Sequence, residues 1–212
     1  MLGRRVSRGD TLVEVLFAVT VFSFVVVGAL SIMNQGTAAS QRSLEITLVR
    51  QQIDAQAEVL RFTHDSYVAE YRTGISYDTT DTETSPAEEW WRMTTSGFSA
   101  TSASPFGSTS DGCPTPPTGS FIMDPRNVRF MPGTGSNLQP SVTYAQVTHT
   151  ATGAFSAAQG LWIEPIRAAN NFDSDQSSTG FIDFHIRACW EAPGTSAPLT
   201  TGTIVRLYEP RN

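Results

Sequence analysis

The 212-residue sequence contains no lysine: all 14 basic side chains are arginines, against 20 acidic residues. The absence of lysine excludes Schiff-base chemistry and phosphate binding through a P-loop lysine. The shortage of positive charge also argues against a nucleic-acid binder, which usually has a basic surface. At this length the chain has room for one domain, or for one domain with an extended element.

Cysteine is equally scarce, with Cys113 and Cys189 as the only two in the chain. Two cysteines are too few for a zinc site of their own. They predict one disulfide formed in an oxidising compartment, and two free thiols in the core are the alternative. A bridge would staple the loop around Cys113 to the strand around Cys189.

Patterns for catalysis or metal binding are also missing. The three histidines, His64, His149 and His185, are widely separated, and none accompanies a nucleophile or a ligand cluster. Asp183, His185 and Arg187 share one strand face, which predicts an exposed polar stripe. The oxygen-rich run 170–177 lacks the spacing of an EF-hand, so we interpret it as a solvated turn. We expect no enzyme activity, no metal site and no cofactor.

A long apolar run is present near the N-terminus. Residues Val15–Met33 carry no charge, and their number is close to the roughly 20 that a helix needs to span a bilayer. Residues 1–9 contain three arginines and no acid, and this positive charge should hold them on the cytoplasmic side. Glu14 is the anomaly, because a carboxylate at such a run is costly and usually has a functional partner. Neither a secretory signal cut after Ala29-Leu30-Ser31 nor a plain signal anchor explains Glu14.

The stretch Gly9-Asp10-Thr11-Leu12-Val13-Glu14-Val15-Leu16 resembles the cleavage and methylation motif of type IV pilins and pseudopilins. The resemblance covers residues 3–33. It implies that a prepilin peptidase cuts between Gly9 and Asp10, and that Glu14 then neutralises the N-terminal amine of a neighbouring subunit. Asp10 departs from the family, which usually has an apolar residue there, and its carboxylate competes with Glu14 for the amine. Processing would leave 11 arginines against 20 acids, a formal net charge of −9.

The rest of the chain divides by composition. Leu44, Leu48, Ile53, Ala57 and Leu60 recur at helical spacing. Because no proline precedes Pro86, one helix from Thr11 to His64 is expected, weakest at Ser31–Thr37. We therefore predict a leader at 1–9, a membrane-spanning and filament-core helix at 10–33, and an amphipathic continuation at 34–64. An acidic loop rich in serine and threonine follows at 65–119.

Beyond Gly119 the pattern changes to short runs typical of strands. They fall at Ser120–Met123, Val128–Met131, Ser141–Thr150, Leu161–Ile166, Gly180–Trp190 and Thr203–Tyr208. Residues 182–190 alternate, with Ile182, Phe184, Ile186, Ala188 and Trp190 on one face. We predict an α+β fold in which a long N-terminal helix packs on a C-terminal antiparallel sheet at 120–212, as the pilin resemblance also implies.

Trp90 and Trp91 are candidates for surface binding. Adjacent exposed tryptophans stack on sugars or on a partner protein. The alternative is that one of them covers the edge of the sheet while the other is partly wet.

Three functions fit these observations. The first is a structural or minor type IV pilin serving adhesion, twitching motility or DNA uptake. The second is a minor pseudopilin of a type II secretion system, and the third is a membrane-anchored extracellular binding module. Under the first, the partners are prepilin peptidase, other pilin subunits and the pilus assembly machinery. The chain would be a single-pass protein of the inner or cytoplasmic membrane before assembly, and part of an extracellular pilus afterwards.

Overall fold

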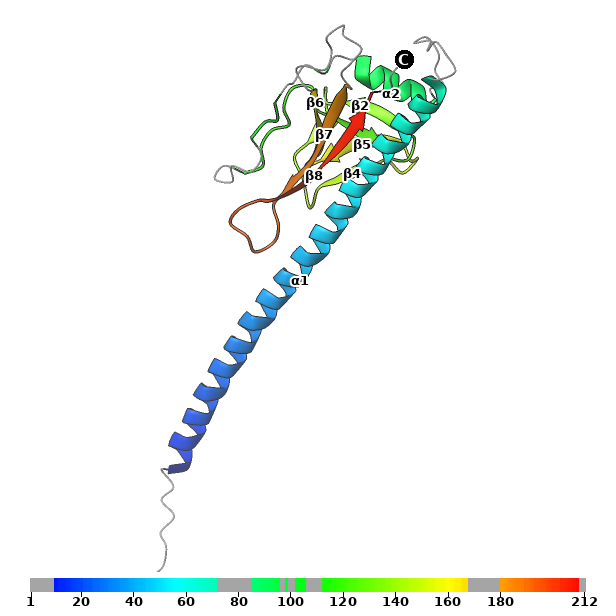
Figure 1. Ribbon diagram of the computed structural model, residues 1–212. Helices are drawn as coiled ribbons and strands as arrows, with labels where there is room; N and C mark the ends of the chain where they lie inside the picture. Colours follow the sequence, from blue (N-terminus) through cyan, green and yellow to red (C-terminus); the bar gives the residue numbers. More distant parts are fainter. Residues whose placement is uncertain are drawn as a thin grey trace, which may run out of the picture. The chain divides into compact units, whose positions relative to one another are not determined.

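The computed structural model describes residues 10–71, 85–95, 98, 102–105, 112–167 and 180–209. The predicted leader and the oxygen-rich run 170–177 lie outside these residues. The chain divides into two compact units, Met1–Ser43 and Leu44–Asn212. Figure 1 labels most of the elements, which in chain order are α1 (Asp10–Tyr71), α2 (Pro86–Thr95), β1 (Phe121–Asp124), β2 (Arg129–Pro132), β3 (Leu138–Gln139), β4 (Gln146–His149), β5 (Phe155–Gln159), β6 (Leu161–Arg167), β7 (Phe181–Trp190) and β8 (Leu199–Tyr208).

Helix α1 is continuous from Asp10 to Tyr71. The expected kink or melting at Ser31–Thr37 is wrong, because this segment is uninterrupted helix. Single poor helix formers cost only about 1 kcal/mol or less each, which the rest of a long helix outweighs. The helix also continues about two turns past the predicted end at His64.

From Leu44 onward α1 belongs to the second unit and is amphipathic. Val49, Ile53, Ala57 and Leu60 are at most 4% exposed, and their spacing of three and four residues places them on one helix face. Leu44 was predicted to share this face, but 60% of its side chain is exposed. The core stripe therefore begins about one turn later than the sequence pattern suggested.

Two glutamines on α1 bind the backbone of both sheets. The Gln56 side chain accepts a hydrogen bond from the Met123 N–H (3.0 Å) and donates one to the Met123 carbonyl (2.9 Å), as a neighbouring strand would. One turn earlier, the Gln52 oxygen accepts from the N–H of Val147 at 3.3 Å. These bonds satisfy buried main-chain groups where the helix crosses the sheets.

The larger sheet has the strand order β2-β1-β6-β7-β8, and every pairing is antiparallel. Its inner face carries the alternating residues predicted from the sequence: Phe184 and Ile186 are fully buried, and Trp190 is 1% exposed. They join one core with the apolar face of α1. The predicted α+β fold, a long N-terminal helix packed on an antiparallel sheet, is confirmed.

A smaller sheet, in the order β3-β5-β4, was not resolved by the sequence pattern. Strand β5 had no counterpart among the predicted runs, and β3 pairs with it in parallel. Strand β4 covers only the second half of the predicted run Ser141–Thr150. These strands are too short for a clear alternation of apolar and polar residues.

The region 65–119 is not a single loop, because it contains the end of α1 and the whole of α2. The signals for α2 are local. Ser85 Oγ accepts a hydrogen bond from the Glu88 N–H at 3.2 Å, Pro86 takes the first helical position, and Glu88 and Glu89 lie in the first turn. Each of these favours a helix N-terminus.

Candidate functional site

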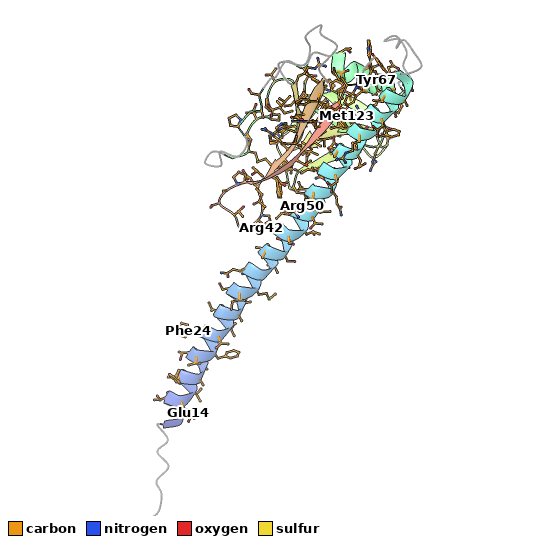
Figure 2. All side chains as sticks on the ribbon, in the orientation of Figure 1. Glu14, Phe24, Arg42, Arg50, Tyr67 and Met123 are labelled. Carbon is orange, nitrogen blue, oxygen red and sulfur yellow. A yellow bond between two sulfur atoms is a disulfide. The ribbon has the colours of Figure 1, made fainter. Side chains whose placement is uncertain are left out.

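The first part of α1 exposes a continuous apolar surface. Phe17, Phe22 and Phe24 are 69%, 68% and 78% exposed, respectively, and Figure 2 labels Phe24 on this part of the helix. The helix is long and apolar enough to cross a membrane, and its most apolar window is not buried within the protein. Residues 12–33 extend about 33 Å along the helix axis, which matches a hydrocarbon core of about 30 Å. By its length and composition, this surface is suited to lipid or to other apolar helices.

Hydroxyl groups within the apolar segment donate hydrogen bonds to main-chain carbonyls of the preceding helical turn. Thr20 Oγ1 donates to the carbonyl oxygens of Phe17 (2.7 Å) and Leu16 (3.1 Å), and Ser23 Oγ donates to that of Val19 (2.8 Å). These polar side chains are therefore compatible with a water-free environment.

Glu14 is different from these hydroxyls. It is the only charged residue from Leu12 to Gln41, its side chain is exposed (Figure 2), and no described residue donates a hydrogen bond or forms an ion pair with it. An ionised carboxylate in hydrocarbon is costly unless a cation neutralises it. If this segment is in an apolar environment, the partner of Glu14 must come from another molecule or from the chain's own N-terminus.

The predicted cleavage site lies at the start of the described chain. Gly9 is outside the described residues, and α1 begins at Asp10. The Asp10 side chain is likewise not described. Cleavage between these two residues stays a prediction.

The predicted disulfide between Cys113 and Cys189 is confirmed, with the two Cα atoms 5.6 Å apart. Cys189 lies near the end of β7 with its side chain opposite to the inner-face residues Ala188 and Trp190. The bridge therefore fixes the segment around Cys113 to the outer face of the larger sheet. Both sulfurs are used, so the alternative of two free thiols is excluded.

A buried ionic network lies on the same outer face. Glu164 on β6 and Arg187 on β7 are 3% and 6% exposed, and Arg187 Nη2 lies 3.1 Å from Glu164 Oε2. The other Glu164 oxygen accepts hydrogen bonds from Ser104 N–H (2.9 Å) and Oγ–H (2.6 Å), and Arg187 Nη1 donates to the Ser104 carbonyl (2.9 Å). The expected exposed stripe is thus wrong for Arg187, because the segment containing Ser104 covers it.

The remaining members of the predicted stripe stay near the surface. Asp183 receives two hydrogen bonds of 2.7 Å from the exposed Arg206 guanidinium, and these bonds lower the pKa of the Asp183 carboxyl. Partial burial lowers the pKa of His185, and the nearby positive charge of Arg187 lowers it further. The Asp183–Arg206 pair is partly exposed, and such pairs contribute little to stability.

The two tryptophans have different environments. Trp90 is 1% exposed and packs edge-to-face on Phe184 with the ring centroids 5.7 Å apart. It is a core residue, so its prediction as a surface-binding residue is wrong. Trp91 is half-buried, which matches the alternative in which only one of the pair is partly wet.

A histidine and a carboxylate form a pair between the two sheets. His149 Nε2 lies 2.8 Å from Asp124 Oδ1 in a buried pair that links β4 to β1. Burial alone would raise the pKa of the Asp124 carboxyl, but hydrogen bonds from His149, Asn127 and the Arg126 N–H together lower it. No group of three or more histidine, cysteine, aspartate or glutamate side chains suited to a metal occurs in the described part of the chain.

Comparisons of the chain with protein-family models, with curated proteins and with solved structures found no match.

Proposed function

We propose that this chain is a subunit of a type IV pilin-like filament, most simply a minor pilin of a pilus used for attachment, twitching motility or DNA uptake. One observation carries the proposal: Glu14 is the only charged residue from Leu12 to Gln41, on the exposed apolar part of α1, and it has no partner among the described residues. In a bundle of such helices, the α-amine of a neighbouring subunit would neutralise it.

The absence of lysine supports non-covalent assembly of the subunits over assembly through isopeptide bonds. Filaments joined by isopeptide bonds need a lysine amine on each subunit, and this sequence has none. Subunits of this chain must therefore associate without such bonds, and an apolar helix of sufficient length supplies the contact surface.

The test of the proposal is Glu14→Gln, with Glu58→Gln as the matched control on the same helix. Glu58 is exposed, and among the described residues it pairs with Arg61 three residues away, so its loss should leave filament yield unchanged. Removing one partner of a buried ion pair costs about 3–5 kcal/mol. Filament yield after shearing should therefore fall more than about a hundredfold in the Glu14 variant.

The lysine-free composition permits a direct probe of the neutralised amine. Apart from the N-terminus, the 212 residues contain no primary amine, so an amine-reactive reagent modifies only that position. The proposal expects slow labelling in sheared filaments and fast labelling after the filaments are dissociated in detergent. Equal labelling in both states, or equal yields of the two glutamate variants, contradicts it.

Shearing also separates a pilus from the secretion alternative. A pilus subunit is recovered in the sheared fraction of cells at native expression. A minor pseudopilin of a type II secretion system stays with the cell envelope, and its loss reduces the export of enzymes into the medium.

A further inference from the structure

The two edge strands of the larger sheet, β2 and β8, differ in how well they are protected from pairing with another chain. Edge strand β2 is four residues long, ends at Pro132, and has the Phe130 N–H bonded to the Glu89 carboxylate of α2 at 2.9 Å. Proline, a short strand and a covering helix are the usual devices that prevent pairing with another chain. Edge strand β8 has ten residues, no proline and no lysine.

The register of β8 identifies the backbone groups at its free edge. Glu209 N–H donates to the Gly180 carbonyl at 2.9 Å, and Tyr208 pairs with Phe181. Because an antiparallel ladder alternates, Thr200, Gly202, Ile204, Arg206 and Tyr208 direct their N–H and C=O groups away from β7. The Tyr208 carbonyl lies 2.8 Å from His64 Nε2 on α1, whereas no described residue bonds the outward groups of Gly202 or Ile204.

Side chains beside this edge form a knob and a hollow. Ile204 is 59% exposed. Next to it, Gly202 leaves a shallow hollow of about 290 Å³ bounded by His185, Arg187 and Ile204. A side chain is not tolerated there, since a Cβ at Gly202 would lie 2.6 Å from the Ile186 carbonyl oxygen. The knob and the hollow lie two residues apart on the same face of one strand.

From this arrangement we propose that two copies of the chain pair their β8 edges antiparallel about a two-fold axis at Thr203. In this register Gly202 lies opposite Ile204 of the partner copy, so each exposed isoleucine covers the hollow of the other. Residues Thr200–Val205 carry no charge, and Arg206 is already neutralised by Asp183. The contact is therefore a neutral patch on a chain of net charge −6, and no like charges meet across it.

Pairing about Thr203 also fits the length of the open edge. It uses Thr200 to Arg206 on each copy and leaves out Tyr208, whose carbonyl α1 already occupies. A two-fold contact is isologous, whereas successive subunits in a filament repeat head-to-tail. The proposed pair therefore joins two filaments, or two unassembled subunits, and it does not depend on the proposed function.

Cross-linking of the full chain in detergent micelles tests this register. At the two-fold axis the Thr203 Cα atoms of the two copies lie about 4.5 Å apart, which suits a disulfide. Thr203→Cys should form a covalent dimer under mild oxidation, with the 203–203 peptide identified by mass spectrometry. The matched control is Thr201→Cys, because residues 201 of the two copies lie roughly 14 Å apart and cannot bridge.

A second substitution separates edge pairing from association through the apolar helix. Ile204→Lys in the Thr203→Cys background should lower the dimer yield about tenfold, and Ile204→Val should preserve it. Both variants should keep the Cys113–Cys189 bridge and the wild-type circular dichroism. A Thr203→Cys yield equal to that of Thr201→Cys, or one insensitive to Ile204→Lys, overturns the proposal. Cross-linking in cells to a chain of different mass overturns the choice of a second copy as the partner.

Discussion

Large apolar side chains from Leu12 to Met33 are exposed, whereas those of the second unit form a buried core. Phe24 is 78% exposed, whereas Phe184 is fully buried among the residues of the core. In the second unit, one face of α1 and the two sheets bury their apolar side chains in a common core. A disulfide and a buried ion pair lie on the outer face of the larger sheet. In the described part of the first unit, the large apolar side chains from Leu12 to Met33 are all exposed. Its helix is long and apolar enough to cross a membrane.

The largest expected effect on stability is that of replacing a buried phenylalanine, and an exposed phenylalanine serves as its control. Phe184→Ala should destabilise the second unit by about 4 kcal/mol, because it leaves a cavity in a packed core. Phe24→Ala should change the same unfolding free energy by less than about 0.5 kcal/mol. All four tryptophans, at positions 90, 91, 162 and 190, lie in the second unit, so urea unfolding followed by tryptophan fluorescence measures that unit alone. Equal effects of the two substitutions would contradict the division.

Removal of the disulfide should have the next largest effect. Cys113→Ala with Cys189→Ala should lower the unfolding free energy by about 3 kcal/mol, since the unfolded chain gains freedom when the bridge is lost. Reduction of the wild-type protein should give a similar decrease in the same fluorescence assay. Insertion of the apolar helix into membranes should be unchanged, because the bridge lies entirely in the second unit. A loss of membrane association would link two regions that we consider independent.

Gln56 offers a smaller and more local test. Gln56→Ala should destabilise the second unit by about 2 kcal/mol, because the buried N–H and C=O of Met123 lose their partners. Gln51→Ala, on the exposed face of the same helix, is the control and should be nearly neutral. Hydrogen exchange at Met123 should accelerate in the first variant only. Unchanged exchange would mean that the glutamine does not protect β1.

The smallest effect concerns acid stability. The pKa of the Asp124 carboxyl is lower in the folded protein than in the unfolded chain, so the ionised form stabilises the fold. This contribution is complete above the unfolded value of about 4 and is lost as the pH falls through the folded pKa. Asp124→Asn should flatten the decrease in stability below about pH 4, measured by thermal unfolding. An identical acid profile for Asp124→Asn and wild type would assign the effect to other carboxyls.

The sequence predicts the regular elements of this fold better than its long-range polar contacts. Strand β7 could be read from alternation, because the inner face demands an apolar residue at every second position from Ile182 to Trp190. Helix α2 was missed although Ser85, Pro86 and Glu88 form a recognisable N-terminal signal, since the surrounding serine-rich and threonine-rich composition favoured a loop.

The polar network on the outer sheet face could not have been predicted. Ser104, Glu164 and Arg187 come from three distant segments, and each would be ordinary surface polarity in isolation. Only the folded chain shows that Ser104 covers the other two. Glu14, by contrast, can be identified from the sequence alone, because a charge within an apolar run is an anomaly.

The decisive experiment for filament assembly is mass spectrometry of the intact chain and of its N-terminal peptide, on protein sheared from cells. We predict a mature chain that begins at Asp10, carries the Cys113–Cys189 bridge and is recovered in the sheared fraction. A chain that retains Met1–Gly9 would contradict filament assembly and would leave an anchored extracellular module in its place. A processed chain found only in the membrane pellet would contradict a pilus and would leave the pseudopilin or the anchored module.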